Sequence, residues 1–80
     1  MNTYQTTHQS KCPNGQLNDT YQITIKSPTT IMVEDIMTTL KQCPNPIYQE
    51  DLADYLRTKL GTVVVVEGWH HGIFVRCERQ

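Results

Sequence analysis

The sequence has few aromatic residues, no long apolar run, no paired cysteine motif and no excess of one charge. It contains one Trp and one Phe in 80 residues. A monomer of this size buries only about 60–65% of the surface of its unfolded chain, and oligomerisation is a common remedy. The longest apolar run, residues 63–66, is far shorter than the ~20 residues that cross a bilayer. Lys and Arg number 7 against 8 Asp and Glu, which argues against a monomer that binds nucleic acid through a broad basic face.

The cysteines argue against a disulfide framework, because there are three of them and none forms a Cys-x-x-Cys motif. Residues 1–11 are polar, so no signal peptide is expected. The sequence therefore predicts a reducing, cytoplasmic setting without membrane attachment. The histidines and cysteines lack the spacing of zinc ligands, so no metal site is expected. Cys43 and Cys77 are predicted to be small apolar packing residues.

Alternation of apolar and polar residues predicts strands in both halves of the chain. In residues 21–26, Tyr21, Ile23 and Ile25 share one face. Residues 62–67 are rich in β-branched side chains and residues 73–77 alternate again, which predicts a hairpin with a five-residue turn at 68–72. Residues 1–11 are either a frayed arm or a polar edge strand, and residues 12–15 form a turn.

Two segments in the middle of the chain have helical spacing. Residues 33–42 present Val33, Ile36, Met37 and Leu40 on one face, and a second helix spans residues 48–60. Acidic residues lead and basic residues trail in both helices, as the helix dipole favours, and Gly61 is placed as a cap. The apolar stripe of the second helix is Tyr48, Leu52, Tyr55, Leu56 and Leu60. The predicted fold is one α+β domain over residues 1–80, in the order β-β-α-α-β-β.

Cys12 and Asp19 are the first candidate pair for chemistry. Pro13 fixes the backbone after the cysteine, and Asp19 follows seven residues after it, across the predicted turn. A carboxylate near a thiol can take its proton and return it later, which makes the sulfur a nucleophile. The simpler interpretation is a small turn residue and a carboxylate at the start of a strand, and spacing by itself favours it. Glu34 and Glu50 have an equally simple interpretation, because acidic residues are common in the first turn of a helix.

Several fragments occur together in a fixed order: Cys12-Pro13, Asp19, Val33-Glu34, Gln49-Glu50-Asp51-Leu52 and a turn that ends in Gly72-Ile73. This set resembles the 7-cyano-7-deazaguanine (preQ0) reductase family, and most of all its small relatives, the archaeosine-forming, QueF-like amidinotransferases. The resemblance covers about residues 11–77. It implies the tunnelling fold (T-fold), in which two helices lie on one face of an antiparallel sheet. It also implies that copies assemble into an oligomeric barrel with the ligand site between subunits.

The resemblance implies a role for each matched residue. Cys12 matches the nucleophile that adds to the nitrile and forms a thioimide, and Asp19 matches the acid/base. Glu50, next to Gln49, matches the carboxylate that anchors the guanine-like ring. Glu34 matches the start of a segment that contacts substrate and, in the reductases, the nicotinamide cofactor. These residue types suit the chemistry, since a nitrile needs a thiolate at carbon and a proton at nitrogen, and one carboxylate accepts two parallel hydrogen bonds.

The segment after Glu34 departs from the reductases, which carry a Glu-Ser-Lys-Ser-type sequence whose lysine helps to hold NADPH. Asp35 and Ile36 follow Glu34 here, and the histidine that usually precedes the anchoring carboxylate is Gln49. The missing lysine favours an amidinotransferase, in which ammonia attacks the thioimide and leaves a formamidine, with no cofactor. The alternatives are an NADPH-dependent nitrile reductase and a non-catalytic purine-binding or structural oligomer. The expected ligand is 7-cyano-7-deazaguanine, free or within tRNA or DNA, although near-neutral charge suits a nucleic acid poorly.

Overall fold

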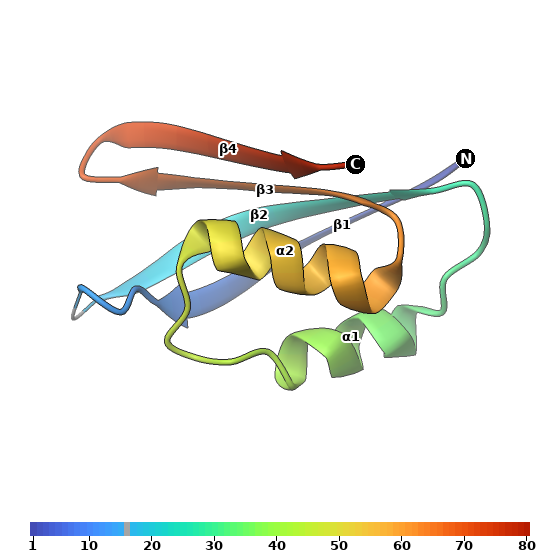
Figure 1. Ribbon diagram of the computed structural model, residues 1–80, viewed down its shortest axis with the longest axis horizontal. Coiled ribbons are helices and arrows are strands. Elements are labelled where there is room, and N and C mark those ends of the chain that lie inside the picture. The colour runs from blue at the N-terminus through green and yellow to red at the C-terminus, as the bar shows by residue number, and fades with distance from the viewer. Residues whose placement is uncertain (16) are drawn as a thin grey trace.

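The predicted order of elements is present in the computed structural model, which describes residues 1–15 and 17–80 (Figure 1). The elements are β1 Asn2–Lys11, β2 Asn18–Ser27, α1 Val33–Lys41, α2 Gln49–Leu60, β3 Val63–His70 and β4 Ile73–Arg79. The strands form one antiparallel sheet in the order β1-β2-β3-β4. Both helices lie on the same face of that sheet. The α+β prediction is therefore confirmed.

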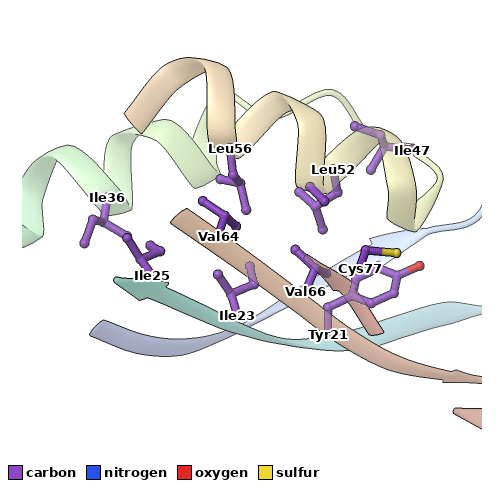
Figure 2. Close-up of a cluster of buried hydrophobic side chains, with 11 residues drawn as sticks. Tyr21, Ile23, Ile25, Ile36, Ile47, Leu52, Leu56, Val64, Val66 and Cys77 are labelled. Carbon is purple, nitrogen blue, oxygen red and sulfur yellow. The ribbon is translucent and has the colours of Figure 1, made fainter. Parts of the chain in front are cut away.

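The core lies between the helix-covered face of the sheet and α2 (Figure 2). Alternation along β2 points Tyr21, Ile23 and Ile25 to this face, where each is at most 1% exposed. The side chains that meet them from β3 and α2 are Val64, Val66, Leu52 and Leu56. Burial of one such aliphatic side chain contributes about 1.5–3 kcal/mol, so this cluster holds in place the strands that lead to the candidate site.

The N-terminal segment is an edge strand rather than a frayed arm. β1 pairs with β2 along its whole length, from Asn2 to Lys11. Tyr4 packs against the core, and its hydroxyl accepts a hydrogen bond from the backbone N–H of Ile31 at 2.9 Å. The sequence left both alternatives open, because the side chains of this segment are polar and its pairing depends on backbone hydrogen bonds that any residue can make.

The turn between β3 and β4 is shorter than the predicted five residues at 68–72. β3 continues to His70 and β4 begins at Ile73, so His71 and Gly72 alone form the turn. Their φ angles are 53° and 81°, as in the two-residue turns that match the twist of a hairpin. The prediction was wrong because Gly68, a residue type typical of turns, lies inside β3. Trp69 and His70 are consequently strand residues that face opposite sides of the sheet.

The apolar stripe of α2 is confirmed in its centre and wrong at its start. Leu52 and Leu56 are fully buried, but Tyr48 is the exposed N-cap residue. Gln49 and Ala53 are buried in its place. A buried glutamine at the start of a helix needs hydrogen-bond partners, and those partners belong to the candidate site.

The stripe of α1 is largely uncovered. Ile36 is buried, whereas Val33 and Met37 are 56% and 51% exposed. Together with Tyr4 they line a groove of about 400 Å³ between α1 and β1. Clustered apolar exposure of this kind is typical of a surface that associates with another molecule.

Cys77 is buried in the core and Cys43 packs against it, so the prediction of packing roles for both is confirmed. Burial raises the pKa of each of these thiols.

Within the residues described, neither helix is long and apolar enough to traverse a bilayer.

Candidate active site

Three segments that are far apart in the sequence meet at one end of the molecule, which we call the site end: the turn at residues 12–15, the start of α2 and the β3–β4 turn (Figure 1). A pocket of about 310 Å³ lies between the first and third of these segments, and its lining includes Cys12, Asp19 and His70. A second pocket of about 220 Å³ adjoins it, where Gln49 and Glu50 join Cys12 and His70. Four of the five predicted site residues therefore gather here.

Strand pairing explains why Cys12 and Asp19 come together. The β1–β2 register places Ser10 opposite Asp19. Cys12 therefore directly follows β1, and Asp19 is the second residue of β2. The backbone N–H of Gly15 donates to the Cys12 carbonyl at 2.9 Å, which closes the turn. Both side chains consequently border the first pocket, as their spacing across a predicted turn indicated.

The loop before α2 anchors the end of β1. The Ser10 hydroxyl and the Lys11 backbone N–H both donate to the Asn45 side-chain oxygen, at 3.1 Å and 3.0 Å. The Ile47 N–H donates to the Lys11 carbonyl at 2.9 Å. Ser10 is fully buried, so these bonds satisfy a polar group that would otherwise cost stability. They also hold the start of α2 next to Cys12.

Gln49 connects α2 to the two C-terminal strands. Its side-chain nitrogen donates to the carbonyls of Val66 and Val75, both at 2.9 Å. Its side-chain oxygen lies 2.7 Å from His70 Nε2. The amide is 5% exposed, and both of its N–H groups are used within the protein. The remaining acceptor position on Oε1 is the one through which Gln49 can contact a ligand.

His70 is a site residue that sequence reasoning missed as part of this constellation. Its Nδ1 lies 3.6 Å from Asp19 Oδ2, on the side of the ring opposite the bond to Gln49. The misplaced turn hid it, because a turn residue has no defined face. Continuing the alternation Val64, Val66 through Gly68 would have put His70 on the helix-covered face.

Tyr21 and Gly68 complete the floor beside Asp19. The Tyr21 hydroxyl donates to Asp19 Oδ2 at 3.4 Å, and the ring lies 5.8 Å from the His70 ring. Burial, and then the Asp19 carboxylate, raise the pKa of Tyr21 well above its usual range, so its hydroxyl stays a donor. A Cβ on Gly68 would lie 2.7 Å from the Tyr21 ring. The glycine is therefore needed for the close approach of this ring.

Glu50 and Glu34 occupy different ends of the molecule. Glu50 is exposed in the first turn of α2 and lines the second pocket. Glu34 is exposed in the first turn of α1. That helix begins at the end of the molecule opposite the site end (Figure 1). Within one chain, Glu34 is thus the predicted site residue that does not join the others.

The arrangement places one thiol and two carboxylates around two adjoining pockets. Cys12 and Asp19 border the same pocket, and Asp19 has the imidazole of His70 behind it. Across residues 1–15 and 17–80, no three His, Cys, Asp or Glu side chains are grouped to hold a metal ion. The chemistry that these side chains can perform themselves is thiol addition with proton transfer.

No protein-family model and no curated protein matches the chain. Among solved structures, the chain is similar to the archaeosine synthase QueF-Like in the apo form, with a TM-score of 0.77. The likeness covers 96% of this chain and 88% of that chain, at 19% sequence identity. At this identity the likeness establishes the fold. The chain has the β-β-α-α-β-β architecture of the tunnelling fold, as the resemblance implied, and shares it with a QueF-like archaeosine synthase.

Proposed function

We propose that this protein is a QueF-like amidinotransferase that acts on 7-cyano-7-deazaguanine. The observation that carries the proposal is the meeting of Cys12, Asp19 and Glu50 around two adjoining pockets. Folds host many functions, so the residues weigh more than the architecture. The structural likeness to an archaeosine synthase supports the same assignment.

The proposed reaction has two steps. First, Cys12 Sγ forms a bond to the nitrile carbon and Asp19 gives a proton to the nitrile nitrogen. The thiol proton of Cys12 passes to Asp19 in exchange, and the product of this step is a thioimide. Then ammonia attacks the same carbon, the carbon–sulfur bond breaks, and one proton from ammonia returns to the sulfur. The product is a formamidine that weighs as much as the ligand plus one ammonia.

Glu50 is proposed to bind the guanine-like edge of the ligand. A ring N–H and an exocyclic amine point in the same direction on that edge, and one carboxylate accepts from both. Gln49 cannot supply donors of its own, because both of its N–H groups bond to strand carbonyls. Toward the ligand, Gln49 can therefore only accept a hydrogen bond through Oε1, the atom that also contacts His70.

We further propose that the working form is a homo-oligomer with the ligand site between subunits. Val33 and Met37 are more than half exposed, and β1 and β4 are the outer strands of the sheet. Outer strands offer unpaired backbone groups to another chain. Because Glu34 lies away from the site end of its own chain, its predicted ligand contact requires a second copy that brings its α1 to that site.

The proposal includes no nicotinamide cofactor, because the residues after Glu34 do not fit one. The Ile36 side chain points into the core (Figure 2), and Asp35 adds a negative charge. Neither can pair with a dinucleotide phosphate, which needs a cation or N–H donors. The ligand is proposed to be the 7-cyano-7-deazaguanine base, free or carried by tRNA or DNA, with ammonia as the nitrogen donor.

Incubation with 7-cyano-7-deazaguanine followed by intact-protein mass spectrometry tests the proposal. Wild-type protein should gain the whole mass of the ligand, since addition to a nitrile loses no atoms, and ammonium should release the formamidine. Cys12→Ala should form no adduct, while the matched control Cys43→Ala should form it as wild type does. An adduct on Cys12→Ala would contradict the nucleophile assignment. NADPH oxidation that requires the nitrile would favour the reductase, and binding without any adduct would favour a non-catalytic purine-binding oligomer.

A further inference from the structure

The orientation of the Gln49 amide is determined by its surroundings. Its side-chain nitrogen faces two backbone carbonyls, of Val66 and Val75, at 2.9 Å each. Carbonyl oxygens only accept, so the NH2 group must point at them and Oε1 must point away from them. Oε1 is consequently the atom that faces His70 Nε2 at 2.7 Å.

This amide orientation determines the tautomer of His70. Because Gln49 Oε1 can only accept, Nε2 of the imidazole must carry a hydrogen. In a neutral ring Nδ1 then has a lone pair, and it faces Asp19 Oδ2 at 3.6 Å. A lone pair opposite a carboxylate is repulsive, whereas a proton on Nδ1 or on Asp19 would make the contact between them attractive.

We propose that His70 is a positioning residue that shares one proton with Asp19 and thereby keeps the acid/base loaded. The proposal rests on the reaction proposed above and adds a residue to it. When Cys12 bonds to the nitrile carbon, Asp19 gives the shared proton to the nitrile nitrogen. The thiol proton of Cys12 then enters the pair. The Asp19–His70 pair ends the step with one proton, as it began.

The groups around the pair suit this role. The Tyr21 hydroxyl donates to Asp19 Oδ2 at 3.4 Å. Because its pKa is raised, this hydroxyl keeps its own hydrogen and does not take the shared proton. Cys12 and His71 border the pocket on the Asp19 side, and Glu50 borders the pocket on the Gln49 side. The His70 and Asp19 side chains are 26% and 24% exposed, which leaves a route for exchange with solvent.

One arm of the test needs no ligand. Nitrogen NMR of the protein labelled in its imidazole rings should find neutral His70 as the Nε2–H tautomer. Its Nδ1 signal should shift when Asp19 is replaced by Asn. A neutral His70 ring with its hydrogen on Nδ1 and none on Nε2, or an Nδ1 signal that does not change in the Asp19→Asn variant, would overturn the shared proton.

The other arm follows adduct formation with 7-cyano-7-deazaguanine as a function of pH. His70→Gln keeps a hydrogen-bonding side chain but cannot titrate, so it should slow the reaction about 10- to 100-fold, less than loss of a primary acid/base. It should also remove the pH dependence that the shared proton gives to the rate. Ligand affinity, measured on the Cys12→Ala background, should stay within about twofold, since His70 is not proposed to touch the ligand.

His8→Gln is the control, because His8 is a half-buried histidine on β1 that lines neither pocket. It should react at the wild-type rate. A wild-type rate and pH profile for His70→Gln would overturn the inference while leaving the proposed reaction intact. If no variant forms an adduct, the proposed reaction fails, and the NMR arm decides the proton pair independently.

Discussion

The two helices begin alike in sequence and differ in what surrounds their first turns. Each starts with acidic residues, led by Glu34 in α1 and Glu50 in α2, and neither has a side-chain N-cap bond. Cys12, Gln49 and His70 gather at the start of α2. The start of α1 lies at the other end of the molecule, where α2 ends (Figure 1). We call this the opposite end, and Gly61 belongs to it as the C-cap of α2.

This difference separates the local preference for acidic residues at the start of a helix from a predicted role in ligand binding. The helix dipole stabilises an acidic first turn in both helices, so the charge pattern says nothing about ligand binding. The direction of α2 brings its first turn to the site end, where β1 finishes and β3 turns into β4. The following tests break or sharpen the contrast between the two ends.

Glu50→Gln should have the largest effect. It replaces one acceptor oxygen with an NH2 group that faces a ligand N–H, so a charge-assisted bond is lost and two donors oppose each other. Affinity for 7-cyano-7-deazaguanine should fall about 30- to 1,000-fold. Calorimetry on the Cys12→Ala background measures binding without covalent trapping. Equal affinities would leave Glu50 as a helix-start charge, like the simplest interpretation of Glu34.

Gly68→Ala should destabilise the fold at the site end. The new Cβ would lie 2.7 Å from Cδ1 and 3.0 Å from Cε1 of the buried Tyr21 ring. Overpacking of this kind costs about 1–3 kcal/mol of unfolding free energy. Gly61→Ala at the opposite end is the matched control, because nothing lies within 4 Å of its Cβ and only its φ of 69° is unfavourable. Urea unfolding should find a loss of about 1 kcal/mol there, and a Gly68→Ala protein as stable as wild type would contradict the packing argument.

Cys12 should react with a thiol reagent at least about tenfold faster than Cys77. Thiolate is the reactive form, and burial raises the pKa of Cys77 and of Cys43, so less thiolate is present at a given pH. Cys12 is half-buried and borders both pockets. Rates measured on variants that keep one cysteine each separate the three sites. If Cys43 reacts first, the accessible thiol lies outside the proposed site.

Glu34→Gln should have the smallest effect, and only in the assembled protein. If a second copy supplies this carboxylate, the variant should weaken ligand binding about 3- to 10-fold at concentrations where light scattering finds an oligomer. Below the assembly range it should bind as the Cys12→Ala background does, whereas Glu50→Gln should be weak at both concentrations. Unchanged affinity in the oligomer would make Glu34 a helix-start charge only.

Sequence reasoning succeeded where one side of an element differs chemically from the other. The alternation at Tyr21, Ile23 and Ile25 predicted the buried face of β2. It failed where the role of a residue depends on its contact with a residue far away in the sequence. Gly68 resembles a turn residue, but it admits the Tyr21 ring, which belongs to another strand. Tyr48 matches the helical spacing, but α2 begins one residue later and leaves its side chain exposed.

The sequence by itself determined the order of elements and placed Cys12 and Asp19 on either side of one turn. Periodicity and turn residues act over a few residues, and two ends of one hairpin loop meet whatever the rest of the chain does. Only the tertiary structure decided that Gln49 and His70, 21 residues apart, share a hydrogen bond behind Asp19. That contact depends on the β2–β3 register and on the packing of α2 over β3 and β4. Long-range pairing of this kind follows from the packing of the whole core, which no local pattern encodes.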